Sequence, residues 1–251
     1  PAGKKIALLE PHAGDFRRDD LFVELAKAYN QNFQPEKALQ LLLSHVFVAC
    51  EGGEHAIADQ YMYAWFQLGM AKKAAGDWAG CYELLEKALT LPKSLGSGIW
   101  NRCKYVPYQF HMAECLEHMG KKEDAQSIYR MILDIEVEFF SNMHLRELPY
   151  YQALCAEALG LQQKAWNIMA RAKRDWSFNL DRKDNGFFST TPFFISFAQD
   201  PAIARLAYYQ YLLGLVKLYE GDRERAKALF RESYAGNSDS LFCHYYAHLL
   251  P

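Results

Sequence analysis

The sequence has no long cationic run, no apolar stretch of membrane-spanning length and no cysteines at paired spacing. Lys and Arg number 28 against 30 Asp and Glu, a formal charge of −2, and basic residues adjoin only in pairs such as Lys121–Lys122. Such a chain offers little to a phosphate backbone, so we expect no nucleic-acid partner. A membrane span needs roughly 18 apolar residues in a row, and residues 1–14 are too short in their apolar part for a signal peptide. We therefore expect a soluble, cytoplasmic protein with no membrane partner.

The cysteines are scattered, without the C-x-x-C spacing of a zinc or redox motif. This pattern is typical of reduced thiols that pack as small hydrophobic side chains, so we expect neither disulfides nor a metal site from them. The six are Cys50, Cys81, Cys103, Cys115, Cys155 and Cys243.

The sequence is rich in apolar and aromatic residues, which make up 51% and 15% of its 251 positions. This is enough to build a core, and it excludes a disordered chain. The chain starts at Pro1 instead of Met and stops at Pro251 without a polar tail. We therefore expect it to be a piece of a longer protein.

One pattern recurs five times along the chain. A polar or glycine turn is followed after five positions by a small residue, and four positions later by a large apolar one. The copies are NFQPEKALQLL (32–42), GDWAGCYELL (76–85), GKKEDAQSIY (120–129), GLQQKAWNIM (160–169) and GDRERAKALF (221–230).

Each turn is preceded by a stretch with helical periodicity, so every copy predicts two antiparallel helices. A small residue in each helix marks the place where the pair crosses most closely. In the first helices these are Ala26, Gly69, Ala113, Ala153 and Gly214, and in the second helices Ala38, Cys81, Ala125, Ala165 and Ala226.

The predicted fold is therefore an all-α, right-handed solenoid of about five elongated helix pairs plus a C-terminal capping helix, forming a single domain over residues 1–251. The units exceed the standard length of about 34 residues, and the surplus follows each second helix, most of all between 174 and 200. The predicted repeats are roughly 18–46, 58–92, 104–134, 147–174 and 202–236, and the capping helix is 239–250.

The repeats resemble the tetratricopeptide family, most specifically at Trp65, Leu68 and Gly69, which reproduce the W-x2-L-G half of the family signature ahead of Gly76. Residues 41–61, 84–98 and 187–230 further resemble the C-terminal helical region of large bacterial proteins. In those proteins a β-sandwich region related to sugar-processing enzymes comes first. This second resemblance implies a non-catalytic tail of a carbohydrate-active protein of unknown function. The Glu51-Gly52-Gly53-Glu54 loop is its most distinctive element.

Three groups of residues could carry chemistry, and each has a simpler interpretation. His111, Cys115 and His118 share one predicted helix face and could ligate zinc, as could His244 and His248 beside Cys243. Packed or solvated helix faces explain both spacings better, so we predict no metal and no cofactor. Glu51 and Glu54 could form an acid and base pair, but two carboxylates around Gly-Gly more often make a turn. We predict no catalytic residues and no enzyme activity.

The concave face of such a solenoid is lined by the first helix of each pair, and here that face is predicted to be aromatic. Exposed aromatic rows commonly bind other molecules, although longer helices could equally bury them. We predict a protein-interaction or scaffold module that packs against the β-sandwich region of its own parent protein or self-associates; the alternative is a peptide- or carbohydrate-binding groove. The candidate binding residues are Tyr63, Phe66, Met70, Lys73, Phe110, Glu114, Tyr150, Tyr208 and Tyr211.

Overall fold

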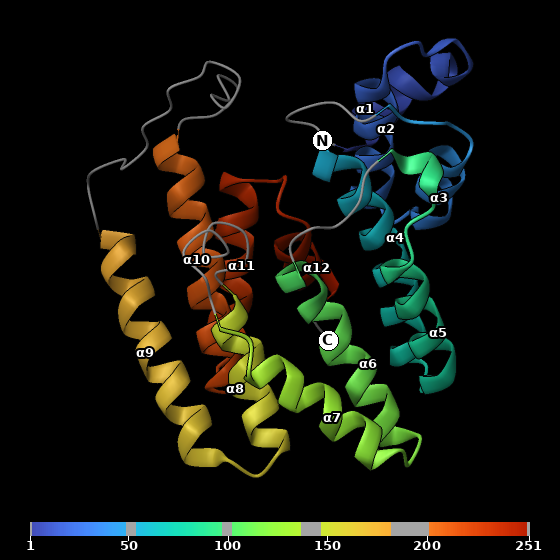
Figure 1. Ribbon diagram of the computed structural model, residues 1–251. Coiled ribbons are helices and arrows are strands. Elements are labelled where there is room, and N and C mark those ends of the chain that lie inside the picture. The colour runs from blue at the N-terminus through green and yellow to red at the C-terminus, as the bar shows by residue number, and fades with distance from the viewer. Residues whose placement is uncertain (1, 49–53, 97–101, 137–146, 182–200, 250–251) are drawn as a thin grey trace. The chain divides into compact units, whose positions relative to one another are not determined.

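The computed structural model describes residues 2–48, 54–96, 102–136, 147–181 and 201–249, and in these it contains twelve α-helices, three short 3-10 helices and no strand (Figure 1). The chain divides into two compact units, Pro1–Ile128 and Tyr129–Pro251. The α-helices are α1 (Ala2–Leu9), α2 (Asp19–Gln31), α3 (Pro35–Leu43), α4 (Glu54–Ala74), α5 (Trp78–Leu89), α6 (Val106–His118), α7 (Lys122–Leu133), α8 (Leu148–Ala158), α9 (Gln162–Asp181), α10 (Pro201–Tyr219), α11 (Arg223–Gly236) and α12 (Leu241–Leu249).

The helices α2 to α11 form five successive pairs, followed by α12, so the predicted fold class is confirmed within the described residues. Three differences appear in detail. Helix α1 precedes the first pair and was not predicted, α4 begins at Glu54 ahead of the predicted position 58, and α9 continues to Asp181 past the predicted 174. The rest of the predicted 174–200 surplus, from 182 to 200, lies outside the described residues.

The turn inside each pair has a left-handed residue at the predicted place. Gly76, Gly120, Gly160 and Gly221 have φ between 76° and 82°, and Phe33 has φ 57°. A left-handed residue ends a helix and lets the chain reverse, and glycine adopts it without a Cβ penalty. Phe33 is therefore the one turn residue in this set that carries backbone strain.

Two of the turns also start the next helix with an aspartate cap. The side chain of Asp77 accepts a hydrogen bond from the Gly80 backbone N–H at 2.9 Å, and that of Asp222 accepts one from Arg225 N–H at 3.2 Å. Each satisfies a backbone donor that the first turn of a helix leaves unpaired. A Gly-Asp pair thus ends one helix and caps the start of the next within two residues.

The small residues lie buried where the paired helices meet, as predicted. Ala26, Ala113 and Ala226, for example, have no exposed surface. Of the two crossings that have glycine on the first helix, the one between α10 and α11 is the tighter, because a Cβ added to Gly214 would come within 2.5 Å of the Phe230 ring. At Gly69, between α4 and α5, the added atom would lie 3.3 Å from Leu85. The spacing of each pair therefore depends on these side chains staying small.

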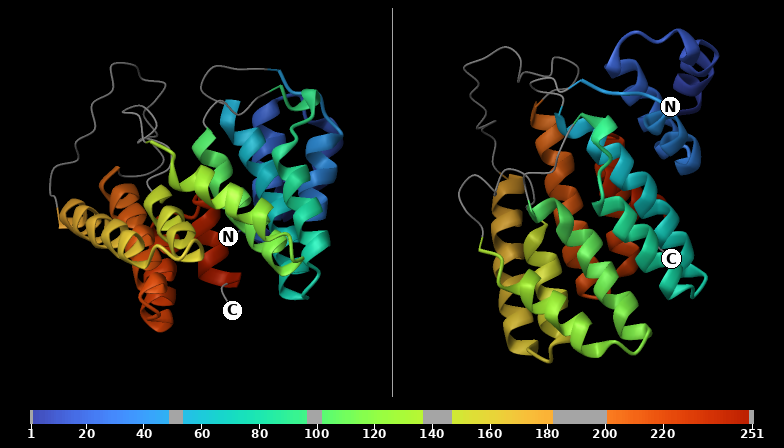
Figure 2. Two further views of the ribbon diagram at one scale, coloured as in Figure 1. Left: turned by 60° about the horizontal axis from the view of Figure 1, so that its bottom comes forward. Right: turned by 45° about the vertical axis from the view of Figure 1, so that its right-hand side comes forward.

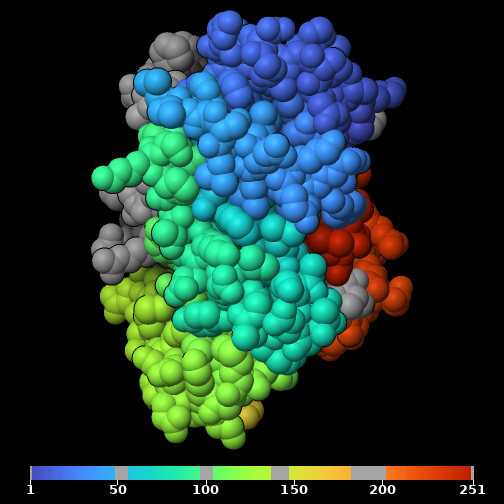
Figure 3. Space-filling view, turned by 90° about the vertical axis from the view of Figure 1, so that its right-hand side faces the viewer, coloured from blue at the N-terminus to red at the C-terminus, as the bar shows by residue number. Residues whose placement is uncertain are grey.

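In the first unit the helix pairs stack in chain order, which Figure 3 shows as successive layers from blue through teal to green. A buried amide network links two pairs, because Asn30 on α2 donates to the Gln60 side chain at 2.9 Å and Gln67 on α4 donates to Asn30 at 3.3 Å. Such a satisfied network holds neighbouring repeats in register.

In the second unit α9 lies beside α8 and α10, and α12 packs on α11 (Figure 2). The Tyr246 ring of α12 stacks on Phe230 of α11 with centroids 4.9 Å apart and also meets Tyr211 of α10. The last helix therefore caps this unit with an aromatic cluster.

The cysteines whose side chains are described, Cys81, Cys115, Cys155 and Cys243, are all buried and form no disulfide. Each lies on a different helix. Among the residues that the structure describes, no helix combines the length and the apolar character needed to cross a bilayer.

Candidate functional site

The structure places the nine predicted groove residues on the first helices of the pairs, α4, α6, α8 and α10. It buries most of them. Tyr63, Phe66 and Tyr211 are at most 1% exposed. Lys73, Glu114 and Tyr208 keep more exposed surface, and Met70, Phe110 and Tyr150 are buried. The aromatic rings thus pack into the core, which is the second of the two alternatives left open by the sequence, and a binding role for them stays a prediction.

In the first unit these rings form a cluster between α4 and α6. The Phe66 ring lies 5.5 Å from Tyr108 and 5.7 Å from His111, measured between centroids, and 6.2 Å from Tyr63 in a stacked arrangement. Ring pairs at these distances stabilise a helix contact beyond their buried area. Their role in the structure is to join the second and third repeats.

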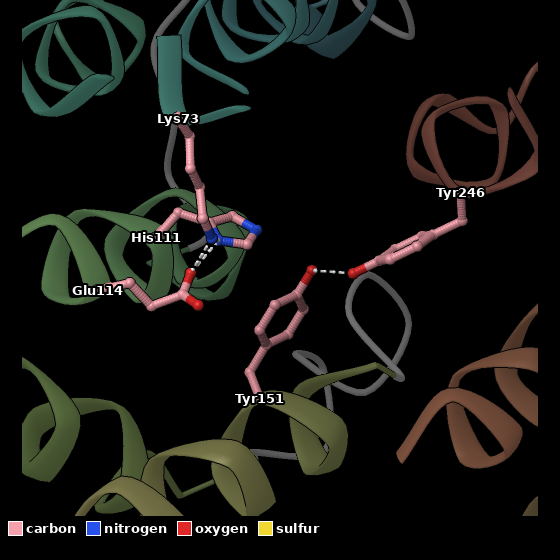
Figure 4. A network of polar contacts seen from close by, with 5 residues as sticks. All are labelled: Lys73, His111, Glu114, Tyr151 and Tyr246. Carbon is pink, nitrogen blue, oxygen red and sulfur yellow. Dashed lines mark hydrogen bonds and ion pairs between the residues drawn. The ribbon is translucent and has the colours of Figure 1, made fainter. Parts of the chain in front are cut away.

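A polar cluster of Lys73, His111 and Glu114, drawn in Figure 4, adjoins these rings through His111. The Lys73 Nζ of α4 is 2.5 Å from Glu114 Oε2 and 3.1 Å from His111 Nδ1, both on α6. His111 Nδ1 also contacts Glu114 Oε2 directly. The sequence predicted Lys73 and Glu114 as separate groove residues, and the structure brings them together with His111. The spacing of His111 from Cys115 and His118 had suggested only a metal ligand.

Burial decides the charges in this cluster. Desolvation and the Lys73 charge lower the pKa of His111, so the imidazole is neutral near pH 7. Burial alone would raise the pKa of Glu114, but the contacts with His111 and Lys73 outweigh it and bring the pKa to about 2. The cluster is therefore a Lys–Glu ion pair with a neutral histidine against it.

The protonation of His111 follows from its contacts. Because an ionised carboxylate can only accept hydrogen bonds, Nδ1 carries the proton and donates a hydrogen bond to Glu114 Oε2. That leaves the lone pair on Nε2, which is buried and has no hydrogen-bond partner. A general base would need a nucleophile at this atom, and within the described residues none contacts it.

In the second unit one of the predicted tyrosines, Tyr208, contacts a buried carboxyl group. Tyr208 donates to Glu147 Oε2 at 3.1 Å, and burial raises the pKa of Glu147. Tyr151 and Tyr246 share a hydrogen bond of 3.4 Å between their hydroxyl groups (Figure 4). Sequence reasoning missed both Glu147 and Tyr246, because only the packing of α12 on the array brings Tyr246 to α8.

The histidines and cysteines whose spacing could have suggested a zinc site make other contacts in the structure. The His118 ring stacks on Trp78 at 3.7 Å between centroids, and Cys115 is buried beside Cys81. Near the C-terminus, the Cys243 thiol donates to Ser233 at 3.2 Å. Among the described side chains no three His, Cys, Asp or Glu residues gather as a metal site would require. The proposed Glu51 and Glu54 pair lies outside the residues whose side chains the structure describes.

Residues 108–135, which include most of α6 and all of α7, match the sequence model of the tetratricopeptide repeat family. Two solved structures are similar over most of the chain: the nearly identical TPR-like repeats of a putative kinesin light chain from Podosopora anserina, and a single-substitution variant of the same repeats. The first is 17% identical, covers 86% of this chain and 93% of its own, and has a TM-score of 0.33. For the second the values are 16%, 90%, 96% and 0.34.

Proposed function

We propose that this chain is a protein-interaction or scaffold module without catalytic activity of its own. It packs against or organises the catalytic part of a larger carbohydrate-active protein in the cytoplasm, or it associates with a second copy of itself. Arrays of helix pairs generally mediate contacts between proteins, because stacking leaves extended surfaces along both sides. The tetratricopeptide match and the five helix pairs support this proposal.

The observation that favours a protein partner over a sugar is the burial of the aromatic rings. A sugar needs open aromatic faces on which to stack, and Tyr63, Phe66 and Tyr211 have almost no exposed surface. Lys73 and Glu114 are the charged side chains of the predicted groove, and they are 24% and 29% exposed. Charged groups at a protein contact give specificity and faster association when the partner carries complementary charges.

Crosslinking of this chain with the β-sandwich region of the longer protein tests the proposal. We expect crosslinks from lysines near the polar cluster, and a Lys73→Ala variant should weaken the contact. Size-exclusion chromatography with light scattering tests the self-association arm. A chain that is monomeric and also makes no contact with the sandwich region would contradict the proposal.

The alternative, a peptide or carbohydrate ligand, is favoured by Tyr208, a half-buried residue whose hydroxyl donates a hydrogen bond to Glu147. A thermal-shift screen with oligosaccharides and short peptides discriminates. A shift that a Tyr208→Phe variant abolishes would favour this alternative, and an unchanged melting temperature with every ligand would exclude it.

A further inference from the structure

The outward side of α9 differs from the rest of the described surface. Two large aromatic side chains, Trp166 and Phe178, are 63% and 68% exposed there. Two arginine side chains on the same helix, Arg171 and Arg174, are 80% and 76% exposed. These four residues are called the α9 strip below.

Helical geometry puts most of the α9 strip on one face of the helix. Arg171, Arg174 and Phe178 stand at i, i+3 and i+7, which is a single face, and Trp166 lies further round, between that face and the buried one. The buried side packs in the core through Ala165, Met169, Ala172 and Trp176. Arg171, Arg174 and Phe178 therefore point away from α8 and α10, the helices against which α9 packs, and Trp166 lies at the edge of this face.

Part of the strip lies on turns that other second helices lack. Helix α9 has 20 residues, whereas the corresponding second helices α5, α7 and α11 have 12, 12 and 14. The part of α9 beyond the length of α5 and α7 carries Arg174 and Phe178. Exposed Trp and Phe side chains lose the stabilisation that burial would bring, and surface aromatics beside arginine are the residues most enriched at protein contacts.

The charge of the strip is only weakly neutralised within the chain. Arg171 and Arg174 share one carboxylate, Asp175, at 3.8 and 3.7 Å, close to the limit for an ion pair. By contrast Lys173, on the side toward α10, is paired with Glu220 at 2.6 Å. Among the described residues the two arginines thus have one carboxylate between them, and the remaining positive charge is available for an acidic group from outside.

We propose that the α9 strip is a docking surface for an acidic amphipathic segment of a partner protein, which deepens the interaction role proposed above and rests on it. Carboxylates of the segment would pair with Arg171 and Arg174, whose planar guanidinium groups suit bidentate contact. Its apolar side chains would cover Trp166 and Phe178. None of the predicted groove residues belongs to the α9 strip. The strip is therefore a binding surface separate from the groove, and it lies on the second helix of the fourth pair.

The test uses the full chain and a fluorescein-labelled helical peptide with leucine on one face and glutamate along its edges. We expect binding by fluorescence anisotropy that weakens as salt is raised, because charge pairs at a surface are screened. An R171E/R174E variant and a W166S/F178S variant should each weaken binding about tenfold or more. Both pairs are exposed, so circular dichroism and the melting temperature should stay unchanged.

The matched control is R223E/R231E, which reverses two exposed arginines on α11. It should bind the peptide as the unchanged chain does. Equal binding of a peptide with lysine in place of glutamate, equal losses in the control, or binding to phosphatidylserine vesicles but not to the peptide would each overturn the proposal. If the crosslinks to the sandwich region persist in R171E/R174E while peptide binding is absent throughout, the strip fails and the broader interaction role stands.

Discussion

At the residue scale, Phe33 is the turn position whose chemistry disagrees with its conformation. A left-handed φ costs a residue with a Cβ about 1–2 kcal/mol, although glycine offsets part of this difference because it loses more chain entropy on folding. We expect Phe33→Gly to stabilise the chain by about 0.5–1 kcal/mol in urea unfolding. The neighbouring Asn32 has φ −105°, so Asn32→Gly should give no such gain and serves as the control. Equal effects of the two changes would contradict the strain argument.

Gly214 and Gly69 occupy equivalent places in their repeats but differ in the room around them. A methyl group at Gly214 would overlap the Phe230 ring, whereas at Gly69 it would meet Leu85 at a distance that a small shift relieves. Gly214→Ala should therefore destabilise the chain by about 1–3 kcal/mol through overpacking, and Gly69→Ala by less. Thermal unfolding of the two variants provides the comparison, and a larger loss at Gly69 would show that the crossing at Gly214 is looser than described.

The histidine of the polar cluster gives stability a pH dependence. The pKa of His111 is lower in the folded chain than in the unfolded one, so the unfolded state binds protons first as pH falls. Its contribution is complete above the unfolded pKa of about 6.5 and is lost as pH drops below that value. Glu114 acts in the same direction further down, between its unfolded pKa and about 2.

We therefore expect the free energy of unfolding to fall between about pH 7 and pH 5, and to fall less steeply in His111→Gln. Urea titrations across this range give the slopes. His12→Gln, at an exposed histidine, is the matched control and should keep the slope of the unchanged chain. The same slope in His111→Gln would mean that His111 is not the group that titrates.

At the scale of single elements, the aspartate caps are the clearest local start signals. Asp222→Ala removes the acceptor of the Arg225 N–H and should cost about 1 kcal/mol, measured by thermal or urea unfolding. Asp222→Asn keeps a capping oxygen and should cost much less. If the two variants lose the same amount, the charge of Asp222 matters and its cap does not.

The elements also show how far sequence reasoning reaches. The turns, the helix pairs and the crossing residues follow from local rules, because a left-handed glycine and a small residue at fixed spacing act within one repeat. The burial of Tyr63 and Tyr211 does not follow from local rules. An aromatic residue on a first helix lines a groove or fills the core, depending on which helices pack beside it. The contact of Tyr246 with Tyr151 spans 95 positions. The cluster at His111 likewise needs two repeats to assemble.

At the scale of the whole molecule, stability in a repeat array is the sum of each repeat and its contacts with the next. A local loss should therefore spread to neighbours before it reaches distant repeats. In Gly214→Ala we expect hydrogen exchange, followed by mass spectrometry, to speed up in α10, α11 and α12 more than in α2 and α3. A uniform increase along the chain would instead indicate a single cooperative unit.

The four buried cysteines give the molecule a set of natural chemical labels. Cys81, Cys115, Cys155 and Cys243 lie on α5, α6, α8 and α12, and none has exposed surface. A thiol reagent can modify each of them only when its own helix opens. The rates of alkylation at the four sites would therefore report the opening of individual repeats in the unaltered protein, without any engineered probe.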